Sequence, residues 1–524
     1  MRKLLSLLLM FMCISCSSNT PVTKTDVTKT SINQTGNNSV VNDLHGLDKV
    51  SYTTYAEHVD KAREATDNSN IGASNTEASS PSYIEESSHD AANNNNYSSY
   101  YSNSYTTPID DMILIYYGSK NRMKWGKTEL KNVVMHTFED GHKDWFFPTF
   151  LYLEFKNDDG LKFGDNQPGS NGPAKKEQWE WLLNRYFSNA YNGGDYEGLR
   201  ALDECIESCK KLLGAPSFSH KVVLGIPSPC TNFTEWGSIK VNGKTIKLDF
   251  RKNSDRLEAV KWFISESVKK FEAQHYKNIT LEGFYWIEES SSMTSWHKDK
   301  KSGKWTNKTN DRFDYVNDAK ARRYNDIVAN VANYVHSLKG LKIYWIPFSG
   351  AYGNDKWRTF GFDRCDIQTG YFWGTPDLLR NPKQLKTISD LKNMCNAAMK
   401  DGKGLEFEMS ADLFVPCYAK LKSKRDIERP YDITKVADCK KTPKEMNASG
   451  YKRFKYNPCL LTRLTNLIDV FEEQGVFERS NISYYFDNSA ILDLCRATDK
   501  DIIRIIDRLA RHISQRNKSH SINY

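Results

Sequence analysis

Short apolar runs alternate with longer stretches of helical periodicity between residue 108 and the end of the chain. Eight runs have the length and composition of buried strands: Met112–Gly118, Thr149–Phe155, Lys221–Pro227, Thr280–Glu288, Lys342–Phe348, Asp366–Trp373, Leu405–Met409 and Ile482–Asp487. Helical spacing of apolar residues separates most of them, as in Glu177–Phe187, Arg256–Phe271, Ala319–Leu338, Gln384–Lys400, Leu460–Glu473 and Asp501–Ser514. Because strands that alternate with helices pair in parallel, this pattern predicts an α/β fold, a (β/α)8 barrel of the TIM type with loop insertions.

Two units depart from the regular alternation. The first crossover, Ser119 to Phe147, shows no clear helical pattern. The third unit contains Ser238–Val241, an Asn-Gly pair and Lys244–Phe250. Asn-Gly between two alternating runs is a strong signal for a tight turn, so this segment predicts an inserted β-hairpin.

Alternation within the seventh run selects two glutamates. Successive residues of a barrel strand point alternately into the barrel and out to the helices. Leu405, Phe407 and Met409 share one face and suit the helix layer. Glu406 and Glu408 are therefore expected to point inward, with Glu408 nearer the carboxyl end, where the active sites of such barrels lie.

The fourth run can be interpreted in the same way. Its apolar residues Leu281, Tyr285 and Ile287 suit the outer face. Glu282, Phe284, Trp286 and Glu288 are then expected to face inward. Glu288 lies at the carboxyl end with Glu289 just beyond it, whereas the deeper Glu282 is expected to be a partner within the core.

Carboxyl groups on two strands of one barrel suit the hydrolysis of glycosidic bonds. In that reaction one carboxyl protonates the leaving oxygen, and the other acts as nucleophile or activates water. We therefore predict Glu288 as general acid/base and Glu408 as nucleophile of a retaining enzyme. The alternative is that such glutamates pair with Lys or Arg and only hold the barrel mouth together.

Further residues at the strand ends are typical of a sugar site, because sugars stack on aromatic rings and bond to carboxylates and amides. The predicted substrate-binding residues are Glu154, Glu289, Trp286, Trp345, Tyr352, Gln368, Tyr371, Trp373, Glu406 and Asp487. By the same alternation, Leu151, Leu153 and Phe155 point outward and Glu154 inward. For each aromatic residue, core packing is the alternative.

The first hundred residues are different in kind. Arg2 and Lys3 precede the apolar run Leu4–Met12, which is too short to span a bilayer. Ser15 is a small residue directly before Cys16, so residues 1–15 predict a lipoprotein signal peptide and Cys16 the lipidated residue. An ordinary secretory signal with incidental cysteines is the alternative. Residues 16–107 are rich in Ser, Thr and Asn and predict a disordered, flexible linker before the barrel of residues 108–524.

Composition adds limits on partners. The net charge of +8 over 524 residues is mild, so it does not indicate binding to nucleic acid. No phosphate-binding loop, dinucleotide fingerprint or zinc-type cysteine pair lies in the barrel region, and we expect no cofactor and no metal. Basic stretches at 297–312 and 420–455 follow the fourth and seventh runs; they are expected to be solvated loops, and the alternative is that they attract an anionic polysaccharide.

Several motifs, taken in order, resemble a bacterial family catalogued as domain of unknown function 4855. They are Phe150–Phe155, Lys221–Pro227, Gly283–Trp286 with the acids that follow, Tyr344–Pro347, Gly361–Asp363 and Gly404–Glu408. The resemblance covers about Asp110 to Asn488 and implies a barrel found among carbohydrate-degrading and surface proteins. The family carries no established activity. Acids on the fourth and seventh strands also look like the large clan of retaining barrel glycosidases, although Ile287 stands where Asn often precedes the acid.

Together these features predict a lipid-anchored, extracytoplasmic protein of the cell envelope, at the outer membrane or cell surface, that hydrolyses glycosidic bonds in a polysaccharide or glycan. A non-catalytic glycan-binding lipoprotein on the same scaffold is the alternative from a different class. A structural surface protein with a filled barrel mouth is the third.

Overall fold

The computed structural model describes residues 110–520, except 165–170, 190, 193–194, 242, 291, 301, 315–318, 339, 374–385, 415–416, 420–451, 455, 488–489 and 498. The predicted signal peptide, Cys16 and the linker lie outside the described residues. No helix in the described part of the chain is long and apolar enough to cross a membrane.

Eight parallel strands form a closed barrel in the spatial order β1-β20-β17-β16-β15-β12-β9-β4. Their bounds are β1 Asp111–Tyr116, β4 Thr149–Leu153, β9 His220–Ile226, β12 Ile279–Trp286, β15 Lys342–Trp345, β16 Arg364–Gln368, β17 Gly404–Glu408 and β20 Ile482–Tyr485. All eight predicted runs fall on these strands, and the predicted (β/α)8 fold is confirmed. Each strand lies beside its sequence neighbour, and β20 closes the ring against β1.

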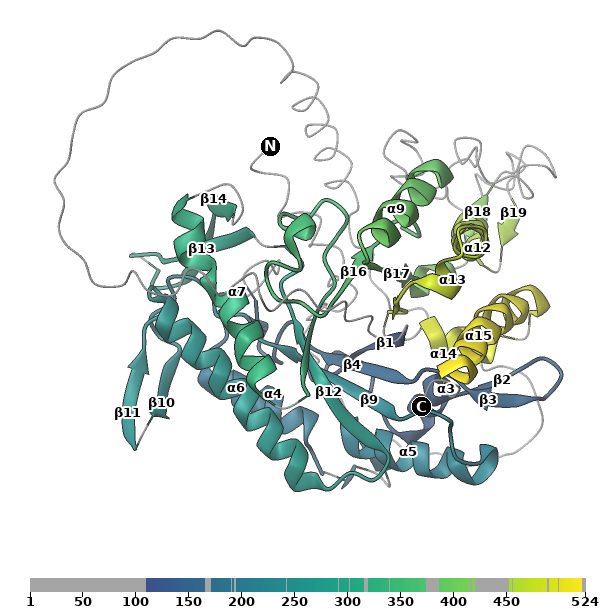
Figure 1. Cartoon of the computed structure of the whole chain (residues 1–524), viewed down its shortest axis with the longest axis horizontal. Coiled ribbons are helices and arrows are strands. Elements are labelled where there is room, and N and C mark those ends of the chain that lie inside the picture. Colours follow the sequence, from purple (N-terminus) through teal and green to yellow (C-terminus); the bar gives the residue numbers. More distant parts are fainter. Residues whose placement is uncertain are drawn as a thin grey trace, which may run out of the picture.

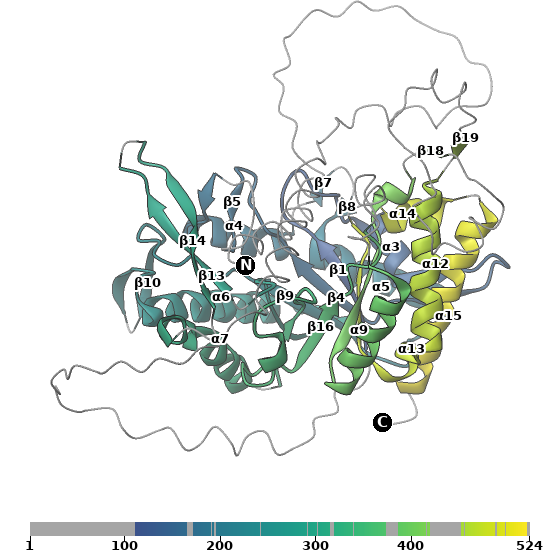
Figure 2. The same cartoon turned by 90° about the horizontal axis from the view of Figure 1, so that it is seen from above.

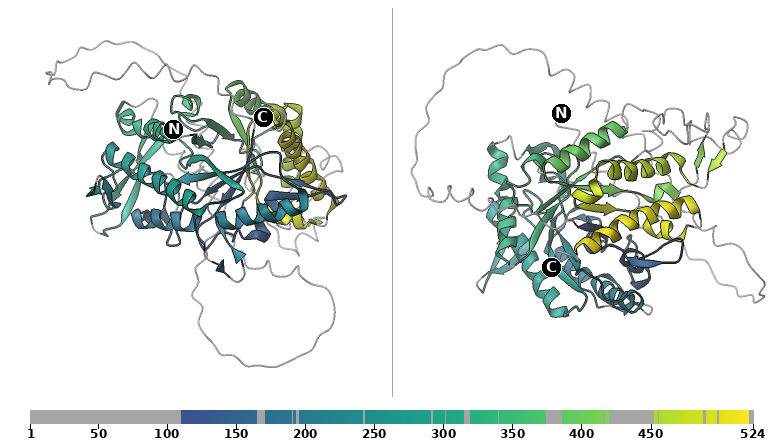
Figure 3. Two further views of the ribbon diagram at one scale, coloured as in Figure 1. Left: turned by 60° about the horizontal axis from the view of Figure 1, so that its bottom comes forward. Right: turned by 45° about the vertical axis from the view of Figure 1, so that its right-hand side comes forward.

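Helices cover the outside of the barrel. They are α3 Lys127–Val134, α4 Lys176–Tyr186, α5 Gly198–Leu213, α6 Asn253–Gln274, α7 Ala319–Ser337, α9 Ile388–Lys400, α12 Pro458–Glu473, α13 Val476–Arg479, α14 Ala490–Arg496 and α15 Lys500–His520. In Figures 1 and 2, the teal helices α6 and α7 lie on one side of the molecule, and α9, α12 and α15 lie on the other. Figure 3 shows the same separation from two further directions.

The loops contain short strands and 3-10 turns. They are β2 Met135–Thr137, β3 Lys143–Trp145, β5 Leu161–Lys162, β6 Gly172–Pro173, β7 Tyr191–Asn192, β8 Asp195–Tyr196, β10 Gly237–Val241, β11 Lys244–Leu248, β13 Ser292–Lys298, β14 Trp305–Asp314, β18 Cys417–Ala419, β19 Lys452–Phe454, and the 3-10 turns η2 Asn354–Lys356 and η4 Ala411–Phe414. β10 and β11 form the predicted Asn-Gly hairpin. The first crossover does contain a helix, which the sequence pattern missed because α3 has only eight residues, of which only Leu130, Val133 and Val134 are buried.

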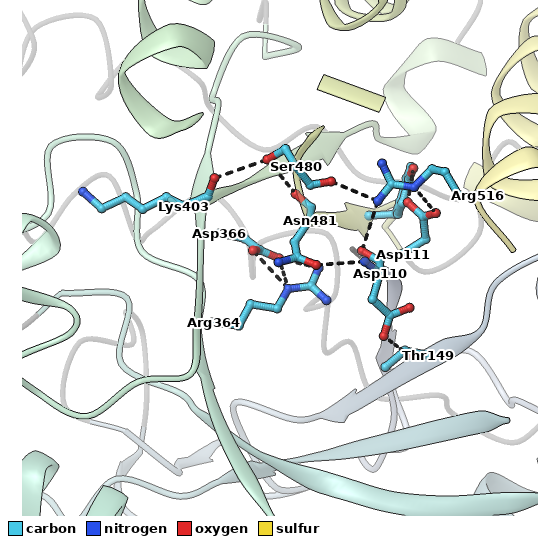
Figure 4. A network of polar contacts seen from close by, with 10 residues as sticks. Asp110, Asp111, Thr149, Arg364, Asp366, Lys403, Ser480, Asn481 and Arg516 are labelled. Atoms are coloured by element: carbon cyan, nitrogen blue, oxygen red, sulfur yellow. Dashed lines mark hydrogen bonds and ion pairs between the residues drawn. The ribbon is translucent and has the colours of Figure 1, made fainter. Parts of the chain in front are cut away.

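Charged pairs fill the amino-terminal end of the barrel (Figure 4). Arg364 and Asp366 form a buried ion pair at 2.7 Å, and Arg516 of α15 pairs with Asp111 at the same distance. The Asp110 backbone N–H donates to the Asn481 side chain at 2.8 Å, which joins the start of β1 to the start of β20. Removing one partner of a buried ion pair leaves the other charge uncompensated and destabilises the fold, so we assign these pairs to the stability of the closed barrel.

Candidate active site

β17 presents two glutamates to the barrel interior. Glu406 is in register with Gln368 of β16 and Ser483 of β20, and Glu408 with Tyr485. On the opposite face, Phe407 packs against Phe471 of α12, with ring centroids 5.9 Å apart. Both glutamates are almost fully buried. The alternation in this strand is therefore the one expected from the sequence.

A β-bulge in β12 reverses the expected alternation of the fourth strand. Leu281 pairs with Val222 and Gly283 with the next residue, Val223, so Glu282 is an extra residue without a register partner in β9. Its carboxylate accepts a hydrogen bond from Lys342 at 2.7 Å. Every residue after the bulge consequently turns to the face opposite to the expected one.

Tyr285 is therefore the inward residue of β12, and Trp286 belongs to the outer face. Tyr285 is fully buried, and the charges of Glu289 and Glu406 contribute, after burial, to raising the pKa of its hydroxyl. Trp286 is in register with Trp345, whose ring stacks on Phe362 at 5.0 Å in the outer layer. The expectation that Phe284, Trp286 and Glu288 share the inner face is wrong, because it did not include the bulge.

Glu289, the residue after Glu288, is the acid that approaches the pair on β17. The Gln368 side chain donates a hydrogen bond to the Glu289 carboxyl, and the Glu408 charge reaches it as well. The Glu288 side chain instead turns toward Gly164, where an added Cβ would lie 2.7 Å from Glu288 Oε1. The Glu288 backbone carbonyl accepts a hydrogen bond from Trp345 Nε1 at 2.6 Å.

The carboxyl groups of Glu289 and Glu408 have different hydrogen-bond environments. Burial, together with the charges of Glu288 and Glu408, raises the pKa of Glu289 to about 8, against the opposing hydrogen bond from Gln368. Burial also raises the pKa of Glu408, but Thr369 Oγ1 donates to it at 2.7 Å and Trp373 Nε1 at 3.1 Å. Hydrogen bonds to the charged form favour that form. Near neutral pH, Glu289 is therefore mainly protonated, while the Glu408 anion has stabilising partners.

The positive charge of Lys386 stabilises the Glu408 carboxylate. Its ammonium donates to the Thr369 carbonyl at 2.6 Å and to Ser349 Oγ at 3.0 Å. Burial lowers the pKa of Lys386, and the charge of Glu408 opposes that shift, while the Lys386 charge lowers the pKa of Glu408. Sequence reasoning missed this residue, because its position beside the seventh strand depends on the path of the chain between β16 and α9.

Three tyrosines and one tryptophan lie near these carboxyls. The rings of Tyr116 and Tyr485 meet edge to face at 5.5 Å, and Trp373 lies 5.8 Å from Tyr485. After burial, the charges of Glu289 and Glu406 contribute to raising the pKa of Tyr116. Tyr116, Tyr285 and Tyr485 were not singled out from the sequence, although alternation along β1 with Met112 and Leu114 would have pointed to Tyr116.

Four predicted binding residues lie away from these carboxyls. Leu153 is in register with the inward Tyr116, so Glu154 belongs to the opposite face, and it forms an ion pair with Arg122 at 3.1 Å. Its predicted inward orientation is wrong, because this side of the barrel interior is itself apolar and alternation by polarity has no signal there. Tyr371 is held in the helix layer, where Arg463 of α12 lies 4.0 Å from its ring centroid. Trp286 and Trp345 share the outer layer described above.

Two more predicted residues lie on loops at the carboxyl end of the barrel. Tyr352 is half-buried in the loop after β15. Asp487 follows β20 with a left-handed backbone (φ 52°), and its charge adds to burial in raising the pKa of Asp412. The structure thus brings together Glu289, Gln368, Trp373, Glu406 and Glu408. Their catalytic or binding roles stay predictions.

Among the described residues, no group of three or more His, Cys, Asp or Glu side chains could hold a metal ion.

Comparison with solved structures gives barrel enzymes at low similarity. A group IV chitinase of Ostrinia furnacalis in complex with allosamidin has 10% identity and a TM-score of 0.35, covering 77% of this chain and 100% of that one. A GH113 β-1,4-mannanase has 11% identity and a TM-score of 0.32, covering 78% and 99%. An endo-β-1,4-mannanase of Cellulomonas fimi has 13% identity and a TM-score of 0.30, covering 73% and 65%. The fold assignment rests on the closed barrel itself.

No curated protein matches the chain in sequence. A family model described as a domain of unknown function (DUF4855) matches residues 111–316 and 312–438. These two matches span most of the barrel, and the chain belongs to this family.

Proposed function

We propose that this protein hydrolyses glycosidic bonds in a glycan, with Glu289 as general acid/base and Glu408 as nucleophile. The observation that carries the proposal is the pair of buried carboxyls at one end of the barrel: the pKa of Glu289 is raised to about 8, and the Glu408 carboxylate accepts hydrogen bonds from Thr369 and Trp373. Enzymes that run acid and base chemistry near neutral pH separate the pKa values of two neighbouring groups in this way. The acid role moves from Glu288 to Glu289, because the bulge in β12 turns Glu289 toward β17.

Each group has a defined step in the reaction. Glu289 protonates the leaving glycosidic oxygen while Glu408 attacks the anomeric carbon, and a covalent glycosyl-enzyme forms. Glu289 then takes a proton from water, the water oxygen bonds to the anomeric carbon, and the bond to Glu408 breaks. Thr369 and Trp373 hold the Glu408 carboxylate in one orientation through both steps.

The N-terminal features extend the proposal to location. Arg2, Lys3, the apolar run and Cys16 support export and lipid anchoring in the cell envelope, outside the cytoplasm. Residues 16–107 would then hold the barrel away from the membrane. A mass spectrum of the purified full chain would show the acyl groups on Cys16, and their absence would contradict the anchor.

The enzymatic proposal is tested by release of reducing ends from a panel of polysaccharides. Glu289→Gln is expected to reduce turnover by at least about 10²-fold, the lower range for one general acid or base. Glu408→Gln removes the nucleophile and is expected to reduce turnover at least as much. Glu288→Gln is the matched control, because it removes the adjacent carboxylate. Turnover that falls with Glu288→Gln but not with Glu289→Gln would return the acid role to Glu288.

Calorimetric binding measurements on the same panel distinguish the proposed hydrolase from a non-catalytic glycan-binding protein. Binding without turnover in the wild type, unchanged in both variants, would overturn the hydrolase. It would leave a glycan-binding lipoprotein.

A further inference from the structure

The structure contains one carboxyl more than glycoside hydrolysis requires. Glu406 lies two residues before Glu408 on the same inward face of β17, so it is one layer deeper in the barrel. It is 1% exposed. Its Oε2 atom is buried and has no hydrogen-bond partner among the described residues. Buried polar atoms without a partner are rare in folded proteins, and a bound group is one of the standard reasons for them.

Three other carboxyl groups affect the ionisation of Glu406. After burial, the charges of Glu408, Glu289 and Asp366 raise its pKa well above the ordinary value. Lys386 acts on Glu408 and Arg364 on Asp366, and both have partners other than Glu406. Lys386 bonds to Thr369 and Ser349, and Arg364 is paired with Asp366. Glu406 is thus a buried carboxyl that is protonated in the free protein and that a bound cation would ionise.

Aromatic rings complete the surroundings. Tyr116 and Tyr285 point into the same barrel interior as Glu406, and the charge of Glu406 contributes, after burial, to raising the pKa of both hydroxyls. A carboxylate among aromatic rings is a favourable environment for an organic ammonium group, because the ring faces also attract cations. A sugar carboxylate or sulfate in the same place would be repelled by the Glu408 carboxylate and would gain no ion pair from Glu406.

We propose that Glu406 binds the ammonium group of an amino sugar, so that the substrate is a glycan with hexosamine residues that lack the N-acetyl group. This inference rests on the proposed function, because it names the substrate class of the same site. The deep position of Glu406 means that a substituent of the sugar, and not the ring itself, reaches it. An N-acetyl group in that position is neutral and bulkier, and it leaves the carboxylate without a countercharge.

Calorimetric binding with three sets of oligosaccharides of equal length tests the proposal. Chitosan oligosaccharides are cationic, chitin oligosaccharides are their N-acetylated counterparts, and oligogalacturonates are anionic. With the full chain, we expect the cationic set to bind at least about tenfold more tightly than the other two. Glu406→Gln is expected to weaken the cationic set alone by about 10- to 100-fold, which is the range for a lost hydrogen bond to a charged group.

Glu282→Gln is the matched control. It removes one negative charge from the same barrel near its amino-terminal end, where Glu282 bonds to Lys342, and it should leave the preference unchanged. A second readout uses the wild type alone and does not depend on the folding of a variant. Binding of an ammonium group to a largely protonated carboxyl releases protons, so the measured heat should change between buffers of different ionisation enthalpy.

The outcomes separate this inference from the proposed function. Equal affinity for cationic and N-acetylated sets, tighter binding of the anionic set, or an unchanged preference in Glu406→Gln would overturn it. Turnover of neutral glycans with no cationic preference would leave the hydrolase and remove the amino-sugar assignment. A cationic preference that depends on Glu406 without any turnover would keep the assignment and remove the hydrolase.

Discussion

Replacing Lys386 by methionine isolates the electrostatic support of Glu408. The lysine contacts the Thr369 carbonyl at 2.6 Å, and the Thr369 hydroxyl contacts Glu408 at 2.7 Å, so one residue separates the two charges. For unit charges roughly 6 to 8 Å apart at an effective dielectric of about 20, the interaction is worth about 2 kcal/mol. That energy corresponds to between one and two pKa units. Since the cation favours the carboxylate, its removal raises the pKa of Glu408.

The pH dependence of kcat/KM measures this change directly, because its acid limb reports the group that must be ionised in the free enzyme. Lys386→Met is expected to move the acid limb upward by about one to two pH units, and activity at the wild-type optimum falls accordingly. Lys386→Arg keeps the charge and should leave the limb within a few tenths of a unit. An acid limb that stays in place in Lys386→Met, or moves downward, would refute the assignment of Glu408 as the ionised group.

Two more expectations follow from the site and its strand. The pKa of Glu289 lies near 8 in the folded protein and near 4.5 in a free glutamate, so the free energy of unfolding falls as pH rises from about 4.5 to 8, because the unfolded chain loses this proton while the folded protein retains it. Glu289→Gln should therefore be more stable than the wild type by about 2 to 4 kcal/mol at pH 9 and nearly equal to it at pH 4, as measured by urea unfolding; the same difference at both pH values would contradict the raised pKa. Gly283→Ala should lower the free energy of urea unfolding by about 3 kcal/mol or more, because the new Cβ would overlap the Lys342 carbonyl oxygen. Gly243→Ala is the control: no atom lies within 4 Å of the added Cβ, so this variant tests only the strain of a positive φ.

The strands of this barrel were predictable because each is a short apolar run between helical stretches. The faces were predictable only where polarity alternates. In β17 the glutamates alternate with Leu405, Phe407 and Met409, and the inward set follows at once. In β4, where both faces are apolar, alternation by polarity had no meaning and placed Glu154 on the wrong side.

The predicted faces of the fourth strand were wrong for a different reason. A bulge adds one residue, and a one-residue shift exchanges the two faces of everything after it. Gly283 was the available signal, since an isolated glycine within a strand often marks a bulge or a close backbone approach. Lys386 and the edge-to-face pair of Tyr116 and Tyr485 depend on contacts between distant segments, and no local pattern contains them.

The seam between β1 and β20 has a consequence for how the chain reaches its final form. Asp110 and Asn481, 371 residues apart, are joined across the seam, and Arg516 contacts Asp110 across 406 residues. β1, the first strand of the barrel to be synthesised, therefore keeps one edge unpaired until almost the last helix has been made. Such long-range closure slows folding. The closed barrel can therefore form only after nearly the whole chain has been made, and the edge of β1 stays available for wrong pairings until then.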